Sequence, residues 1–208
     1  MSKPNIGQSH SVIQALANNV NWEILDHSTL QKIIDDPKEA GKQFTIFLKN
    51  GGKVIVDGPK IIQIDRSKSF DPVTFIGEGW SIEEQDEKSL VLTEVDLSKV
   101  VFETTLEKNE KSIKGENKLK RLKEKSCIRL DAKIFQMLWE NQHLIPENWK
   151  EKTNGNTTYI FFDGTVLRNS VGIRYVLYLY GDGGEWGWFY GWLGGGFGAS
   201  DPSVVLAS

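Results

Sequence analysis

The spacing of apolar positions predicts two consecutive helices near the start of the chain. The first follows a capping residue, Asp26 or Ser28, and runs through Asp35 with its apolar residues on one stripe. The second begins at Pro37, has apolar residues at i, i+4, i+7 and i+8, and is followed by a glycine pair suited to a left-handed cap, Gly51-Gly52. The two stripes consist of Leu30, Ile33, Ile34, Ala40, Phe44, Phe47 and Leu48.

From Lys53 onward the pattern changes to the shorter period of β-strands. Residues 53–67 predict two strands joined by a turn at Asp57-Gly58-Pro59. The β-branched and apolar residues at 90–92 and 100–105 predict further strands. This part of the chain is therefore expected to be an antiparallel meander that follows the helical pair.

A further helix is predicted for the segment AKIFQMLWENQ. Asp131, which precedes it, is the expected N-cap because its carboxylate can accept from the first free amide groups. Ile134, Met137 and Leu138 then fall on one face of the helix. The proline at 146 marks its end.

The last part of the chain has the pattern of an antiparallel sheet. Three strands are predicted, at residues 159–167, 172–180 and 185–193. The segment GDGG at 181–184 predicts a hairpin turn between the second and third strands.

These elements define an α+β fold in which helices pack on antiparallel sheets, and they allow two lobes. The expected organisation is a flexible N-terminal arm at 1–20 with one short helix around 11–18, a helical pair with antiparallel strands at 21–106, a basic linker at 107–117, and a helix with a tryptophan-rich sheet at 118–208.

Composition narrows the class of protein. The 208 residues contain 28 acidic and 25 basic side chains, a balance that does not favour binding to a polyanion. Cys127 is the only cysteine, so an intrachain disulfide and a cysteine-based zinc cluster are excluded. No signal peptide or transmembrane segment is recognised, and we expect a soluble, cytoplasmic protein without membrane contact.

The chemistry-bearing residues predict neither a metal, a cofactor nor a catalytic group. His10, His27 and His143 lack ligand spacing. Cys127 is expected to be a half-buried thiol; the alternative is a thiol whose pKa is lowered by the lysine-rich helix before it. Carboxylates near tryptophan residues favour a glycosidase as an alternative function. Against it, the Asp-Gly steps at 163–164 and 182–183 are first of all signals for turns. The three candidate carboxylates are Asp163, Asp182 and Glu185.

The segment EWGWFYGWLGGGFG at 185–198 is the most unusual in the chain, with three tryptophans and six glycines in fourteen residues. In a strand, Trp186, Trp188, Tyr190 and Trp192 share one face. Gly187 and Gly191, on the other face, leave room for large rings of a neighbouring strand. The favoured interpretation is that the aromatic row covers the helix after Asp131; the alternative is a solvent-facing binding platform.

Residues 107–125 carry seven lysines and one arginine against four glutamates, a local charge of +4. A basic stretch can follow a phosphate backbone, but no aromatic residue lies within it to stack on bases. The favoured interpretation is a solvated loop and helix face, which makes nucleic acid the less favoured partner.

Four pieces of the chain together resemble a family of short, uncharacterised bacterial proteins. They are WEILDHSTLQKIIDDPKEAGKQFTIFLKNGG, FIGEGWSIEE, LWENQHLIPENWK and GEWGWFYGWL followed by SDPSVVLAS. The shared order is a helical pair ending in Asn-Gly-Gly, a Gly-Trp segment, an Ile-Pro-x-x-Trp turn and a closing Trp-rich hairpin. The resemblance implies a bacterial protein and brings no activity, cofactor or catalytic residue with it.

The function favoured by these observations is a non-enzymatic interaction or binding protein. Its partner is another protein or a second copy, and its expected contact surface is the aromatic hairpin, with binding residues Trp186, Trp188, Tyr190, Trp192, Asp182 and Glu185. The first alternative is a carbohydrate-binding or carbohydrate-active module that uses the tryptophan row. The second is a nucleic-acid-associated protein that uses the basic stretch 108–125.

Overall fold

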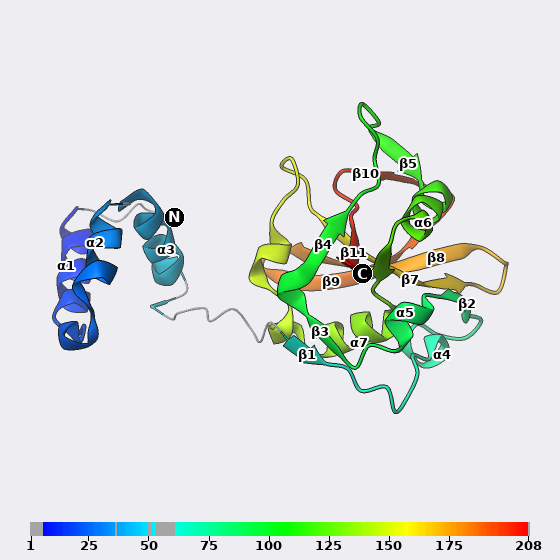
Figure 1. The fold of residues 1–208 in the computed structure, drawn as a ribbon, viewed down its shortest axis with the longest axis horizontal. Coiled ribbons are helices and arrows are strands. Elements are labelled where there is room, and N and C mark those ends of the chain that lie inside the picture. The colour runs from blue at the N-terminus through cyan, green and yellow to red at the C-terminus, as the bar shows by residue number, and fades with distance from the viewer. Residues whose placement is uncertain (1–5, 36, 50, 53–60, 208) are drawn as a thin grey trace. The chain divides into compact units, whose positions relative to one another are not determined.

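The computed structural model describes residues 6–35, 37–49, 51–52 and 61–207. The chain forms two compact units, Met1–Val56 and Asp57–Ser208, and each is described by itself. Figure 1 shows their elements.

The first unit is helical. It contains α1 (Ile6–Ala17), the 3₁₀ helix η1 (Trp22–Ile24), α2 (His27–Asp35) and α3 (Pro37–Lys49). The predicted helical pair is confirmed, and so is its glycine cap: Gly51 and Gly52 have φ values of 66° and 78°. The amide of Gly51 donates to the carbonyl of Leu48, which satisfies a free group at the helix end. Most of the arm predicted at 1–20 is the helix α1.

The second unit combines short helices with strands. Its helices are α4 (Pro72–Phe75), α5 (Glu87–Leu90), α6 (Gly115–Glu124) and α7 (Ala132–Glu140), with the 3₁₀ helices η2 (Leu97–Lys99), η3 (Gln142–Leu144) and η4 (Glu147–Lys150). Its strands are β1 (Ile61–Gln63), β2 (Ser81–Gln85), β3 (Glu94–Asp96), β4 (Val100–Glu103), β5 (Ser112–Lys114), β6 (Cys127–Arg129), β7 (Tyr159–Arg168), β8 (Arg174–Asp182), β9 (Glu185–Trp192), β10 (Gly196–Gly198) and β11 (Ser203–Ala207).

The main sheet has the strand order β4-β11-β7-β8-β9, with β2 also paired to β7 and β6 to β11. Its pairs are antiparallel except for the short parallel contact between β11 and β7. Two small antiparallel pairs, β1 with β3 and β10 with β5, complete the strands among the described residues. The fold is α+β, as predicted.

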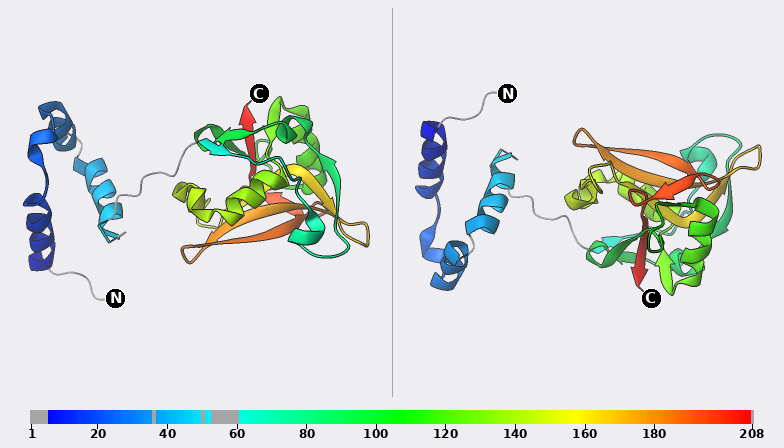
Figure 2. Two further views of the ribbon diagram at one scale, coloured as in Figure 1. Left: turned by 90° about the horizontal axis from the view of Figure 1, so that it is seen from below. Right: turned by 90° about the horizontal axis from the view of Figure 1, so that it is seen from above.

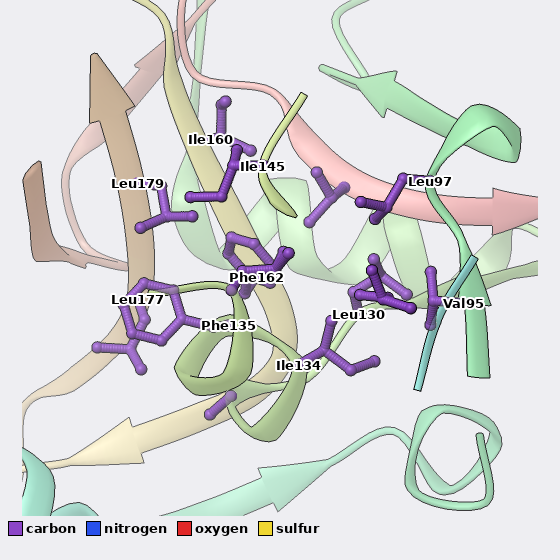
Figure 3. Packing of buried hydrophobic residues seen from close by; sticks show 14 of the residues in the cluster. Val95, Leu97, Leu130, Ile134, Phe135, Ile145, Ile160, Phe162, Leu177 and Leu179 are labelled. Atoms are coloured by element: carbon purple, nitrogen blue, oxygen red, sulfur yellow. The ribbon is translucent and has the colours of Figure 1, made fainter. Parts of the chain in front are cut away.

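One helix packs on each face of the sheet. Figure 2 shows α7 lying along the strands β7 to β9. Its inner face is apolar, as predicted, and Phe135 is fully buried with its ring 5.3 Å from that of Phe162 (Figure 3). On the other face, α6 closes a smaller cluster whose buried members are Ile113, Leu119, Phe161, Val166, Val176, Leu193 and Phe197.

The C-terminal hairpin forms as predicted. Asp182 pairs with Glu185 at its tip, and the two residues between them, Gly183 and Gly184, have φ values of 58° and 95°. Positive φ at both turn positions favours glycine and matches the twist of the strands.

Other predictions need correction. The strand predicted at 90–92 is wrong, because Leu90 belongs to α5 and Val91 is its C-cap. The carboxylate of Asp86 caps this helix by accepting from the amide of Lys88. Of the strand pair predicted at 53–67, residues 53–60 lie outside the described residues, and β1 is the described strand. The strand β11 was not predicted.

The division of the chain also differs from the expected one. Residues 107–117 contain β5 and the start of α6 instead of a connection between lobes. Strand β5 pairs with β10, and β4 pairs with β11. These pairings join the middle of the chain to its C-terminal end, so both belong to one unit.

The Asp-Gly step at 163–164 is not a turn. Both residues lie inside β7, where the register with β8 shifts between Phe162 and Leu167. The Gly164 amide donates to the carbonyl of Leu130, so the segment before α7 approaches the strand closely. A Cβ at position 164 would overlap with the backbone of Arg129.

We therefore expect Gly164→Ala to lower the free energy of unfolding by about 1–3 kcal/mol. The new methyl group would clash with backbone atoms, which cannot move aside by a side-chain rotation. The measurement is denaturant unfolding followed by tryptophan fluorescence. The matched control is Gly196→Ala, since the nearest atom to a Cβ there is 4.0 Å away. Equal stability of the two variants would contradict this account of Gly164.

Candidate functional site

The predicted aromatic row is mostly covered, and Trp188 packs on the helix α7. The ring of Trp188 lies 4.8 Å from Phe75, 5.9 Å from Phe135 and 6.3 Å from Trp139, the last two on α7. Trp186 is only 8% exposed, and Tyr190 is half-buried. For Trp188 the favoured interpretation, a row that covers the helix after Asp131, is confirmed, whereas Tyr190 packs on Trp80 and Tyr175.

The glycines of β9 make room for neighbouring rings, as predicted. A Cβ at Gly187 would meet the ring of Tyr180, and a Cβ at Gly191 would meet the ring of Phe161. The second face of the hairpin is therefore also covered with aromatic side chains, supplied mainly by β7 and β8.

Two aromatic side chains of the hairpin remain at the surface. Trp192 is 55% exposed and Phe189 is 51% exposed. Of the three tryptophans that a carbohydrate platform requires, only Trp192 faces solvent. The sequence pattern did not distinguish Phe189 from its neighbours, because its exposure depends on how the other described elements pack around β9.

Strand β9 ends the main sheet, so one of its sides has no neighbouring strand among the described residues. The Leu193 amide donates to the carbonyl of Arg174 at 3.0 Å, which means that odd-numbered residues direct their backbone groups toward β8. The backbone groups of Trp186, Trp188 and Tyr190 therefore point outward. Within the described part of the chain, no backbone hydrogen bond reaches them on that side.

The two edges of the sheet are protected to different degrees. Natural edge strands are usually short or carry charges and proline, which prevent pairing with other chains. The opposite edge, β4, has four residues and ends in Glu103, which pairs with Lys125 at 2.7 Å. Strand β9 has eight residues, no proline, and a single charge at its first position, Glu185. By this criterion β9 is the unprotected edge.

The predicted carboxylates are not all brought together by the fold. Asp182 and Glu185 are exposed at the tip of the hairpin. Asp163 lies well away from them, because Tyr159, four residues before it, is already opposite Tyr180. Asp163 is therefore on a different part of the sheet from Asp182 and Glu185, which lie opposite each other at the hairpin tip.

A polar cavity of about 480 Å³ opens beside the hairpin tip. Its lining residues are Gln142, His143, Glu147, Lys150, Gly184, Glu185 and Trp186. The ammonium group of Lys150 lies 5.2 Å from the centre of the Trp186 ring and donates to the Gly184 carbonyl. Lys150 thus occupies a face of the indole on which a sugar ring would stack.

Three of the eight basic side chains in the stretch form ion pairs at the surface. Arg121 pairs with Glu110, Lys123 with Glu84, and Lys125 with Glu103. Lys118 is fully buried. These residues do not form the single charged face that binding to nucleic acid requires.

Metal and thiol chemistry find no support in the described residues. They contain no group of three or more possible metal ligands. Burial raises the pKa of the Cys127 thiol, which overturns the alternative of a thiol with a lowered pKa. No helix in the described ranges is long and apolar enough to cross a membrane.

Comparison with known proteins finds no matching family model, no matching curated protein and no matching solved structure. The resemblance to a bacterial family therefore rests on the sequence motifs alone.

Proposed function

We propose that this protein is a non-enzymatic binding protein that adds an extended segment of another polypeptide to its sheet along β9. The observation that carries the proposal is the unprotected edge: the backbone groups of Trp188 and Tyr190 point outward, and Phe189 and Trp192 are exposed beside them. In recognition by strand addition, backbone hydrogen bonds supply affinity and neighbouring side chains supply specificity.

The aromatic side chains suit such a site. Aromatic residues are enriched among the side chains that contribute most to binding at protein interfaces. The core contacts of Trp188 and Tyr190 hold β9 in its extended form in the unbound protein. A strand fixed in this way loses little conformational entropy on binding.

The proposal is tested by placing a lysine on the edge strand. Phe189→Lys adds a charge where edge strands are normally protected, and we expect about a tenfold loss of affinity for the partner. Val171→Lys is the matched control, because Val171 is 74% exposed but lies in the loop before β8. Partners are captured from an extract of the source cells with the wild type and both variants.

Amide hydrogen exchange then identifies the mode of binding. In the complex, the outward amides of Trp188 and Tyr190 should exchange more slowly than in the free protein. A partner that binds Phe189→Lys as well as the wild type, or that leaves both amides unprotected, would contradict strand addition. Sedimentation of the purified protein over a range of concentrations shows whether the partner is a second copy.

A cytoplasmic location is part of the proposal. Its support is the single thiol of Cys127, which is compatible with a reducing compartment.

A further inference from the structure

A buried lysine and a buried aspartate face each other beneath α6. The Nζ of Lys118 lies 3.6 Å from Oδ2 of Asp163, and both side chains are 0% exposed. Phe161 and Phe197 cover the amine, with ring centres 4.7 Å and 4.9 Å from Nζ. Figure 1 shows α6 beside β10 and β5, and α6 carries Lys118 into this cluster.

Lys118 and Asp163 make fewer hydrogen bonds than a buried ammonium group and a buried carboxylate normally make. An ammonium group has three donors, yet Nζ makes one hydrogen bond in the described structure, to the Asp201 carbonyl at 2.7 Å. A carboxylate has two acceptor oxygens, and neither oxygen of Asp163 accepts a hydrogen bond from the described residues. Buried groups in native proteins are normally satisfied far more completely than this.

An amide would fit the same surroundings better. It has one N–H, which the Asp201 carbonyl can accept, and one carbonyl oxygen in place of two charged ones. It also carries no charge, so the desolvation penalty of a buried ion pair disappears. The aromatic rings around the pair exclude the water that would otherwise solvate the charges.

We propose that Lys118 and Asp163 form an intramolecular isopeptide bond. A proton passes from the ammonium of Lys118 to the carboxylate of Asp163, which leaves a neutral amine and a carboxylic acid. The Nζ–Cγ bond forms, one Cγ–O bond of Asp163 breaks, and the second amine proton leaves with that oxygen as water. The products are one amide and one water, and no oxidant or co-reactant is needed.

The surroundings favour the neutral amine on which this reaction depends. Burial lowers the pKa of Lys118, and the charges of Asp163 and Asp201 only partly oppose this. Burial also raises the pKa of the Asp201 carboxyl. The backbone carbonyl of Asp201 positions the amine, and the bond would tie α6 to β7.

The experiment is the intact mass of the purified full-length chain under denaturing conditions. Condensation removes one water, so the measured mass should be about 18 Da below that of the sequence. Peptide mapping by tandem mass spectrometry should find Lys118 and Asp163 in one cross-linked peptide. An unmodified mass, or a mass loss located at other residues, overturns the proposal.

Two lysine variants of α6 test whether the cross-link requires Lys118. Lys118→Arg removes the nucleophile and should restore the full sequence mass. Lys120→Arg, at an exposed position two residues along α6, should keep the cross-link. A cross-linked peptide in Lys118→Arg would also overturn the proposal, and the wild-type mass alone decides the question if this variant fails to fold.

Discussion

Phe135→Ala is expected to lower the free energy of unfolding by about 3–5 kcal/mol, the range for truncating a fully buried phenylalanine. The ring of Phe135 contacts those of Phe75, Phe162 and Trp188, at centroid distances of 5.7, 5.3 and 5.9 Å. Figure 3 shows Phe135 beside Phe162. Removal of the Phe135 ring leaves a cavity between α7 and the sheet that the surrounding rings cannot fill without leaving their own contacts.

Denaturant unfolding followed by tryptophan fluorescence measures this loss, since six of the seven tryptophans lie in the unit Asp57–Ser208. Phe189→Ala is the control: it removes the same group from a side chain that is 51% exposed, and we expect a change below about 0.5 kcal/mol. Comparable losses in the two variants would show that α7 does not hold the core together.

Elements with strong local signals could be predicted from the sequence. The second helix has Pro37 at its start, apolar residues at helical spacing and glycines after its end, and the structure places α3 at Pro37–Lys49. The hairpin of β8 and β9 has the turn residues that its geometry demands. In the segment 87–92, by contrast, the β propensity of the residues predicted a strand where a helical turn forms. The Asp86 side chain caps the backbone there and starts the turn.

Features that depend on distant partners could not be predicted. Strand β11 is a short apolar run at the end of the chain, and it is a strand because β4 and β6 pair with it. Lys118 belongs to a lysine-rich segment typical of a solvated face, yet α6 turns it inward onto Phe161 and Phe197. The edge position of β9 likewise follows from the strand order of the whole sheet.

Asp131→Ala is expected to lower the free energy of unfolding by about 3–5 kcal/mol, the range for removing one partner of a buried ion pair. The carboxylate is buried and caps α7 by accepting from the amides of Lys133 and Ile134. It also pairs with Arg66 at 2.9 Å and accepts from the Ser89 hydroxyl. The substitution therefore leaves the helix end and a largely buried guanidinium without their partner. Asp71→Ala is the capping control, because Asp71 caps α4 at the surface, where water replaces the lost bonds, and its loss should be much smaller.

The double variant Arg66→Met, Asp131→Ala separates the two contributions. If the unpaired guanidinium causes most of the loss, removing its charge should recover part of the stability lost in Asp131→Ala, because an apolar side chain of similar length fills the same space. The recovery remains incomplete, since the α7 cap is still absent and Arg66 also donates to the carbonyls of Ser89 and Leu92. Strictly additive losses in the double-mutant cycle would show that the pairing of Asp131 with Arg66 adds no stability.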